Sequence, residues 1–543
     1  MRSHHNVKVP TTTLVRAVLL FFHPMKGLPA ETDFVVIGAG VAGLRAAIEL
    51  APAGRVLVLA KKETPDFKVA DAKSEAAWLS DEEDVSLHLQ DTLDSGDGLC
   101  NLAAVKMLLE EAPERIDELI AWGKHHETKL TFGLENAHSK GRVLHAQGDS
   151  AGKEIFKALC EKVHSLKHIS IAPFTFTTAI VTEDGRVTGV SLLDEKGVPQ
   201  EIACSAVLLA TGGCGQLYRN TTNPETATAD GVALAARAGA EVSDMEFVQF
   251  HPTALYMKKV PRFFLSEDLR AEGAYLRNFE LDRFMGKYHP LGERAPHDLV
   301  VRAIAHEMEV SRAKDPFVYL DLTHMRASAV QKRFPRIYAA LMAHNIDITE
   351  DVIPIRPAAH YCVGGVRTDL EGKTNVAGLY AAGEVAATGV HGANRLPSNA
   401  LLEGLVFGAR AGRAMREMDR RAPRTGAEPQ AAYSNGPVDA GLEELIGQIQ
   451  DLMWNEVGIV RTRMRMQKAL KALEDMGPKL AQPKTRRKHE AANLHLTSLL
   501  LAKSALAREE SRGAHYRMDS PDHDDKKFLK HSVVKVGGNV RFV

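Results

Sequence analysis

The segment that decides the fold is "TDFVVIGAGVAGLRAAIELA", residues 32–51. Its apolar run, 34–37, is typical of a buried parallel strand, and the residues after the glycines are typical of a helix. Between them, Gly38, Gly40 and Gly43 form the pattern G-x-G-x-x-G. The first glycine allows a tight turn, the second lets the backbone approach a pyrophosphate, and the third lets the helix pack on the strand. An ordinary glycine-rich turn is the alternative, but the place between strand and helix favours dinucleotide binding.

Three later segments extend this unit. "RVLVLAKK" (55–62) predicts a second strand at the spacing of a βαβ unit, and "SAVLLATGG" (205–213) predicts a strand that ends in glycines. "TNVAGLYAAGEV" (374–385) predicts a further strand, which runs into Gly383 and Glu384. Because the dinucleotide site is assembled from distant stretches with an insertion between them, the pattern favours FAD over NAD.

Composition narrows the class of protein. The chain has 543 residues, enough for two or three domains, with 68 Lys and Arg against 69 Asp and Glu. This balance argues against a nucleic-acid-coating protein, and no apolar run reaches transmembrane length, so neither nucleic acid nor a membrane is expected as a partner. The 5 cysteines are scattered and form no CxxC pair, which favours reduced thiols and a cytoplasmic location.

The order of segments predicts an α/β fold with a Rossmann-like FAD-binding domain, an inserted α+β capping domain and a C-terminal helical bundle. The first 30 residues contain "LVRAVLLFF" (14–22) and predict a disordered extension or a start at Met25 rather than an export signal. The predicted units are an extension at 1–30, a discontinuous FAD-binding domain at 31–244 and 360–418, a capping domain at 245–359, a Pro- and Gly-rich linker at 419–441 and a helical domain at 442–543.

Three segments combine cationic side chains with hydrogen-bond donors: "QFHPTAL" (249–255), "RPAAHYCVGG" (356–365) and "HGANRLPSNALLEG" (391–404). A histidine in any one of them is more typical of a core or surface position, but their occurrence together beside FAD motifs predicts a dicarboxylate site. The planar fork of an arginine matches the two oxygens of a carboxylate. In the third segment, Ser398 or Asn399 is the predicted N-cap of a helix whose N-terminus would face the flavin; a plain capped helix is the alternative.

The chain resembles L-aspartate oxidases, in the superfamily of succinate dehydrogenase and fumarate reductase flavoproteins. Two stretches, "LMWNEVGIVRT" and "ESRGAHY", favour aspartate oxidase over its respiratory relatives, and "GLENAH" carries Glu135 where these oxidases place a glutamate that senses the substrate's amino group. The other matching stretches are "VVIGAGVAGL", "GRVLHAQGDSAGKE", "VLLATGG", "TTNPETATADGVALAARAGA", "EFVQFHPTALY", "LRAEGAYL", "PAAHYCVGGV", "GLYAAGEV" and "HGANRLPSNALLEGLVFG".

The resemblance implies oxidation of L-aspartate to iminoaspartate by FAD, with oxygen or fumarate as the final acceptor. This is the first step of quinolinate and NAD synthesis, so a quinolinate synthase is the implied functional partner. It also implies a role for each matching residue. FAD would be bound by Gly38, Gly40, Gly43, Lys61, Asp230, Glu384, Ser398 and Asn399. The substrate would be bound by His251, Ser266, His360 and Arg395. The catalytic group would be His297, Arg395, Glu135 and Glu267, with Arg270 in the adjoining network, and no metal is implied.

One departure from the family lies in "ERAPHDLVVRAI" (293–304), where His297 occupies the position of a family arginine that is thought to pair with the substrate and to transfer protons. An imidazole is only partly cationic at neutral pH, whereas a guanidinium is always charged. Pro296 predicts the first turn of a helix, which would place His297 at its positive end. A neutral imidazole is a suitable general base but a poor fork for a carboxylate. A slower or altered reaction is therefore expected, and Arg294 is a candidate substitute.

A second departure lies in "KVADAKSEAAW" (68–78), where the family has a glycine-containing loop around the flavin. The loss of these glycines predicts a rearranged loop and a weaker or displaced flavin. The loop contains no histidine, so the FAD is expected to be non-covalent. A smaller change places Ala229 where the family has a glycine.

Three hypotheses follow. The first is an L-aspartate oxidase, with activity that is reduced by the departures. The second is a non-catalytic homologue that serves as a binding or regulatory protein. The third is a related flavoenzyme for another dicarboxylate or amino acid, with His297 as its acid or base.

Overall fold

A computed structural model describes residues 27–62, 82–123, 130–133, 143–146, 151–257, 260, 262–419 and 440–543. Glu135 and the loop 68–78 lie outside these residues, as do most of the expected extension and linker.

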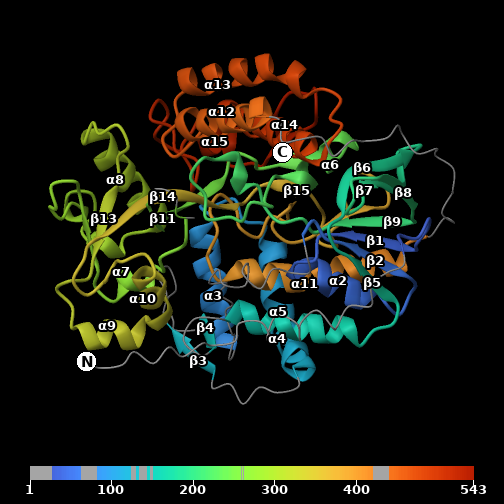
Figure 1. The fold of residues 1–543 in the computed structure, drawn as a ribbon, viewed down its shortest axis with the longest axis horizontal. Helices are drawn as coiled ribbons and strands as arrows, with labels where there is room; N and C mark the ends of the chain where they lie inside the picture. The colour runs from blue at the N-terminus through green and yellow to red at the C-terminus, as the bar shows by residue number, and fades with distance from the viewer. Residues whose placement is uncertain are drawn as a thin grey trace, which may run out of the picture.

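A parallel sheet of five strands lies at the centre of the FAD-binding domain, in the order β16-β9-β1-β2-β5 (Figure 1). Four of these strands are the ones that the sequence predicts, and β5 is additional. Their bounds are β1 Phe34–Ile37, β2 Val56–Leu59, β5 Ile169–Ala172, β9 Ala206–Leu209 and β16 Leu379–Ala381.

The two faces of this sheet are covered differently because alternate residues of a strand point to opposite faces. On one face, Phe34 and Val36 pack with helices, and on the other, Val35 and Ile37 pack with a three-stranded antiparallel sheet and with helices of the C-terminal region. The helices of the first face are α2 Val41–Leu50, α4 Leu102–Trp122, α5 Ala151–His164 and α11 Asn399–Glu417. The antiparallel sheet comprises β6 Phe176–Glu183, β7 Arg186–Leu193 and β8 Pro199–Ala203, and α6 Asp230–Arg237 and the 3-10 helix η1 Gly215–Leu217 lie beside this face.

The cap is built on a separate four-stranded sheet, in the order β11-β14-β13-β12, and has a hydrophobic core of its own. Its strands are β11 Val248–Leu255, β12 Tyr275–Arg277, β13 Val318–Asp321 and β14 Ile353–Cys362. Its helices are α7 Asp268–Ala271, α8 His297–Val310, α9 Ala327–Arg333 and α10 Pro335–Met342, with the 3-10 helices η2 Met285–Lys287 and η3 Gly292–Arg294. Helix α3 Glu82–Ser95 and the hairpin β3 Leu130–Gly133 and β4 Val143–Ala146 belong to the N-terminal half.

The C-terminal region forms the predicted helical bundle and then departs from it. Helices α12 Ala440–Glu456, α13 Arg463–Met476 and α14 Arg486–Ala507 pack together above the FAD-binding domain in Figure 1. The valine-rich end of the chain favours strands over helices. It forms the short helix α15 Asp525–Phe528, β18 Ser532–Val534 and β19 Arg541–Phe542, which return to a sheet of order β17-β15-β10-β18-β19. The other members of this sheet are β10 Val242–Ser243, β15 Gly365–Arg367 and β17 Ala386–Ala387.

Buried ion pairs join the C-terminal region to the start of the cap. The guanidinium of Arg508 lies 2.7 Å from the carboxylate of Glu246 and 2.9 Å from that of Glu510, and all three side chains are fully buried. Arg461 donates a hydrogen bond of 2.6 Å to the backbone carbonyl of Glu246. Removing one partner of such a group leaves an uncompensated buried charge, so these pairs fix the C-terminal region on the rest of the molecule.

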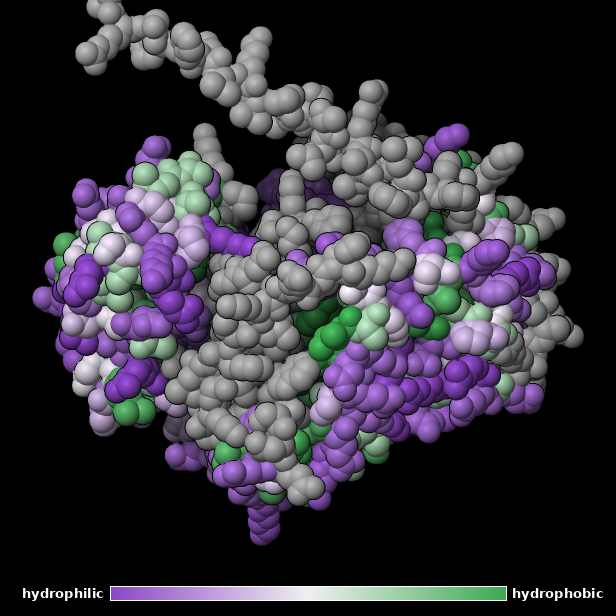
Figure 2. Space-filling model, turned by 90° about the horizontal axis from the view of Figure 1, so that it is seen from below, coloured by the Kyte–Doolittle hydropathy of each residue, from purple (hydrophilic) through white to green (hydrophobic). Residues whose placement is uncertain are grey.

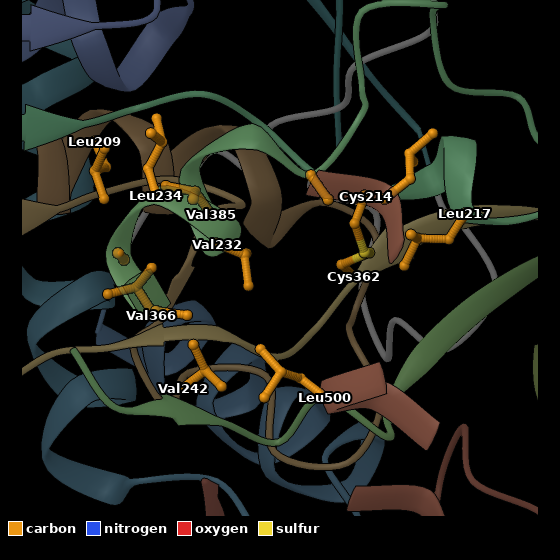
Figure 3. Close-up of a cluster of buried hydrophobic side chains, with 14 of the residues drawn as sticks. Leu209, Cys214, Leu217, Val232, Leu234, Val242, Cys362, Val366, Val385 and Leu500 are labelled. Carbon is orange, nitrogen blue, oxygen red and sulfur yellow. A yellow bond between two sulfur atoms is a disulfide. The ribbon is translucent and has the colours of Figure 1, made fainter. Parts of the chain in front are cut away.

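The expectation that all cysteines are reduced is wrong for this structure. Cys214, after the glycines that follow β9, forms a disulfide with Cys362, the last residue of β14. Figure 3 shows this disulfide among buried apolar side chains that include Leu217 and Val385. The two cysteines are 148 residues apart in the sequence, so their spacing alone could not indicate the pairing. The bond fastens a cap strand to the FAD-binding domain.

In the described parts of the chain, no helix is both long and apolar enough to cross a membrane. Hydrophilic residues cover most of the described surface on the face shown in Figure 2, where hydrophobic residues form small separate patches.

Candidate active site

A cavity of about 520 Å³ lies at the carboxyl ends of the parallel strands. Its wall includes Ile37 at the end of β1, Gly38 after it, Ala210 after β9, and Ala382 after β16. In open α/β sheets, ligands bind in the crevice outside the carboxyl ends of the strands. The N-terminal part of α11 also lines the cavity, and the first N–H groups of a helix have no partner within the helix, which suits the binding of an anion.

The three glycines of the first turn meet different steric demands. Gly38 has a φ of +114°, and a Cβ there would lie 2.1 Å from the carbonyl oxygen of Ala210. A Cβ on Gly43 would lie 2.0 Å from the carbonyl oxygen of Gly38, so this glycine allows the helix to pack and does not line the cavity. A Cβ on Gly40 would meet no atom within 4 Å. The backbone of Gly40 therefore faces open space in the cavity wall, as the approach of a pyrophosphate requires.

The segments that follow β2 and β16 contribute polar side chains to the same wall. Lys61, after β2, lies 2.8 Å from Asp230, the first residue of α6, and 3.0 Å from Glu490. Glu384 follows β16, and its carboxylate accepts a hydrogen bond of 3.0 Å from the backbone N–H of Cys362. Burial raises the pKa of Glu384 to about 7. Glycine backbone and hydrogen-bonding side chains that line one cavity fit a dinucleotide such as FAD.

The far end of the cavity brings together three predicted substrate-binding residues. His251 comes from β11, His360 from β14 and Arg395 from the segment before α11, and all three line the cavity. The ring centres of the two histidines are 5.5 Å apart. Nδ1 of His360 lies 2.8 Å from the hydroxyl of Thr222. Burial, together with the charge of Arg395, lowers the pKa of His360 to about 3, so this imidazole is neutral.

His251 presents a donor that has no described partner. The register of β11 shifts between His251 and Ala254, at a proline that has no N–H for the ladder. The backbone N–H of Thr253 donates to Nδ1 of His251 over 3.2 Å, so Nδ1 is the acceptor. Burial lowers the pKa of His251 well below its ordinary value, which leaves a neutral ring with its proton on Nε2. Nε2 is buried without a hydrogen-bond partner among the described residues.

Arg395 is the second such donor. Its side chain is 5% exposed, and its Nε has no hydrogen-bond partner in the described part of the chain. The guanidinium carbon lies 4.3 Å from the ring centre of Tyr361. The hydroxyl of Tyr361 donates a hydrogen bond of 2.8 Å to the buried carboxylate of Glu403. Gln249 donates to the backbone carbonyl of Arg395 over 2.8 Å. Because a buried donor without an acceptor is unfavourable, both donors are suited to an anionic ligand.

His297 is the first residue of α8 and so lies at the positive end of the helix, as the sequence predicts, whereas Pro296 is the N-cap and not part of the first turn. Its Nε2 is hydrogen-bonded to the carboxylate of Glu267, and its ring centre is 5.3 Å from that of His251. Glu267 also lies 3.8 Å from Arg270, a fully buried cation. Burial lowers the pKa of Arg270, and Glu267 opposes this. The imidazole thus lies between an anion and the substrate end of the cavity.

A second cavity, of about 640 Å³, meets the first at His297. Both cavities are lined by Glu267, His297 and Arg395, and the second is also lined by Arg294. Arg294 is exposed and does not line the FAD cavity. Arg294 and His297 therefore share only the second cavity.

Several predicted residues lie behind the cavity wall. Ser266 is buried, and its hydroxyl accepts a hydrogen bond of 3.2 Å from the backbone N–H of Asp268. Ser398 is the N-cap of α11 but makes no side-chain capping bond. The side chain of Asn399 is bonded to His88 at 2.7 Å and to Thr92 at 3.0 Å. None of these three lines either cavity, whereas Pro397, next to Ser398, lines both.

The sequence did not single out Phe264, Thr222 or Tyr361, which line the same end of the cavity. Phe264 was the easiest to find, because period-two alternation in "RFFLSED" places its side chain opposite those of its two neighbours. Within the described residues, no group of three or more His, Cys, Asp and Glu is arranged to hold a metal ion. Ala229 adopts a φ of +62°, a left-handed conformation that favours the glycine of the family.

Comparison with known families identifies the class of protein. Residues 33–401 match the model of the FAD binding domain, and residues 447–542 match the model described as fumarate reductase flavoprotein C-term. A point mutant of the quinol fumarate reductase chain of E. coli has a TM-score of 0.83 at 30% identity and covers 94% of this chain and 96% of its own. Mycobacterium smegmatis Sdh1 has a TM-score of 0.82 at 31% identity, with 94% of each chain covered. Fold and site together define an FAD-dependent flavoprotein of the succinate dehydrogenase and fumarate reductase superfamily.

Similar sequences narrow the class further. The L-aspartate oxidase of Streptomyces coelicolor is 40% identical, over 94% of this chain and 93% of its own length. The chloroplastic L-aspartate oxidase of Arabidopsis thaliana is 39% identical, over 91% and 82% respectively. That of Acinetobacter baylyi is 35% identical, over 92% and 95%. The chain belongs to the L-aspartate oxidase family.

Proposed function

We propose that this protein oxidises L-aspartate to iminoaspartate. One observation carries the proposal: His251 and Arg395 line the same cavity as Gly38 and Glu384, and each has a buried donor, Nε2 and Nε respectively, without a partner among the described residues. A small dicarboxylate would supply acceptors for these donors beside the bound dinucleotide. The similar L-aspartate oxidases support aspartate as that dicarboxylate.

His251, His360 and Arg395 would hold the two carboxylates of the substrate. The low pKa values of the two histidines favour neutral rings, which donate hydrogen bonds without adding charge. Arg395 is then the main cation that balances the substrate. We assign Ser266 a supporting place behind these residues, and Glu135 the recognition of the amino group.

Oxidation removes a hydride from the α-carbon and a proton from the amino group of aspartate. FAD supplies the hydride acceptor when it is bound in the cavity. Because Nε2 of His297 donates to the carboxylate of Glu267, we assign the proton to Nδ1 of the same ring, which Glu267 holds in place. The negative charge of Glu267 stabilises the imidazolium that forms, and this compensates for the position of His297 at the positive end of α8. Histidine therefore replaces the family arginine as a base, while Arg395 keeps the role of the fixed cation.

The residues of the opposite end would hold FAD non-covalently. Gly38 and Gly40 would face the pyrophosphate of FAD. Lys61 and Asp230 would lie on either side of the outer part of the cofactor. Glu384 would accept hydrogen bonds from hydroxyl groups of FAD. The N-terminal part of α11, which lines the cavity at Ala400 and Leu401, would face the flavin ring, where free N–H groups stabilise negative charge. Ser398 and Asn399 would support it from behind the cavity wall. Gly43 would act through the packing of α2. We assign the FAD-binding domain to 31–244 and 360–418 and the cap to 245–359, except that β14 extends the cap sheet to Cys362. The helical domain would begin at 442, and its last strands join the sheet of β10.

We further propose that oxygen or fumarate reoxidises the flavin and that the product passes to a quinolinate synthase in the cytoplasm. Iminoaspartate hydrolyses in water, so a consuming enzyme should be near. An assay that couples the protein to purified quinolinate synthase tests this link. Quinolinate formation that does not exceed the yield from pre-hydrolysed product would contradict it.

The proposed reaction is tested with the FAD-loaded protein under anaerobic conditions. L-Aspartate should bleach the flavin absorbance, and air or fumarate should restore it. A flavin that is bleached only by a different acid would point to the third hypothesis. A protein that takes up no FAD would refute the proposal and favour a binding role.

A further inference from the structure

Phe264 is an aromatic residue at the substrate end of the cavity whose contacts differ from those of its neighbours. Residues 263–265 run antiparallel to β11, with hydrogen bonds of 2.9 Å from Leu255 N–H to Phe263 and from Leu265 N–H to Thr253. Because side chains alternate along an extended segment, Phe263 and Leu265 point into the core of the cap. Phe264 points the other way and lines the cavity.

The ring of Phe264 contacts both imidazoles of the substrate end. Its centre is 4.2 Å from that of His251, and it stacks on His360 at 5.5 Å with an angle of 16° between the planes. The two histidines are also 5.5 Å from each other, so the three rings form one group. Each imidazole is fixed on its Nδ1, by the N–H of Thr253 or by the hydroxyl of Thr222. The phenyl ring therefore fixes the faces of two donors that are already fixed at one edge.

We propose that Phe264 is a specificity-determining residue that limits the length of the dicarboxylate. This inference rests on the proposed function. The ring is a rigid apolar wall beside the donors that hold the carboxylates, so it sets both the space for the carbon chain and the separation of the donors. On this proposal the wall leaves room for a four-carbon diacid such as succinate or aspartate, and one more methylene group requires the wall to move. In well-packed pockets, one methylene group changes selectivity by about 10- to 200-fold.

The test compares the binding of succinate with that of glutarate, which is longer by one methylene group. Neither acid has an amino-bearing carbon that could be oxidised. Binding of each acid to the FAD-loaded protein is measured by calorimetry for the natural protein, Phe264→Ala and Phe264→Leu. We expect the natural protein to bind succinate at least 10-fold more tightly than glutarate. We expect Phe264→Ala to reduce this ratio to threefold or less and Phe264→Leu to give an intermediate value. Phe264→Ala should also gain activity with L-glutamate relative to L-aspartate.

Phe263→Ala is the matched control. It removes the same side chain from the adjacent position, where the ring packs against the core of the cap, and should leave the ratio unchanged. If Phe264→Ala does not fold, Phe264→Leu carries the comparison. Two results would overturn the length limit while the dicarboxylate site stands. One is a ratio of succinate to glutarate affinity that stays, in both Phe264 variants, within twofold of the ratio of the natural protein. The other is equal binding of the two acids by the natural protein. A natural protein that binds neither acid would overturn the proposed function and this inference with it.

Discussion

Replacing Glu267 by glutamine removes one negative charge beside His297 and keeps the shape of the side chain. Glu267 is 4% exposed and is hydrogen-bonded to Nε2 of His297. A hydrogen bond to a charged group is worth about 1.5–3 kcal/mol. If this bond stabilises the imidazolium that forms during oxidation, Glu267→Gln should slow aspartate-dependent reduction of the flavin by about 10- to 150-fold.

The assay is anaerobic stopped-flow reduction of the FAD-loaded protein by L-aspartate. Glu272→Gln is the matched control, since Glu272 follows α7 only a few residues later and forms an exposed ion pair with Arg333 at 3.0 Å. Such a pair contributes little, so the control should reduce at the natural rate. Thermal unfolding of both variants separates a loss of rate from a loss of fold, because Arg270 also loses part of its counter-charge.

A double-mutant cycle with His297→Asn decides whether Glu267 acts through the imidazole. In the His297→Asn background, Glu267→Gln should have little further effect on the rate of flavin reduction. An equal fall in both backgrounds would refute the reasoning, and so would a single variant whose rate stays within threefold of the natural protein.

Three other predictions concern the cofactor turn, acid stability and the disulfide. Gly40→Ala should fold but lose FAD affinity, whereas Gly43→Ala should fail to fold, because only the new Cβ at residue 43 lies 2.0 Å from a backbone oxygen. Circular dichroism measures the folding of both variants, and titration with FAD measures their affinity for it. The folded pKa of His360, about 3, lies below its ordinary value, so the unfolded chain binds the extra proton and stability falls as pH drops below about 6.5. The loss at pH 5 should be at most about 2 kcal/mol, and melting of His360→Asn should depend less on pH over this range; equal slopes would contradict the assignment. Reducing the bond between Cys214 and Cys362 should lower the unfolding free energy by about 2–4 kcal/mol, and a melting temperature that dithiothreitol leaves unchanged would exclude the bond.

The central part of the fold could be predicted because its signals are local. The apolar runs that become β1, β2, β9 and β16 are each followed by glycine or a small residue, and their carboxyl ends then meet at one edge of a sheet. Pro296 also indicates that a helix begins here, although it forms the N-cap of α8 and not a part of the first turn.

The remaining features depend on register and on contacts between distant segments. The unpaired donor Nε2 of His251 lies beside a register shift in β11, where Nδ1 accepts a hydrogen bond from Thr253. Sequence periodicity cannot predict which of the two ring nitrogens makes this bond. The wall formed by Phe264 requires the segment 263–265 to pair with β11. The valines at the end of the chain favour a strand, but nothing local indicates that this strand, β18, would pair with β10.

The pairing of β18 with β10 has a consequence for how the protein is made. Ser243 and Ser532 share a hydrogen bond although 289 residues separate them, so the ribosome must translate nearly all of the chain before this sheet can close. Until then β10 has an open edge, which is a template for wrong pairing. Nascent chains of this protein should therefore depend on chaperones late in synthesis, and messages truncated shortly before codon 532 should yield aggregates rather than a smaller enzyme.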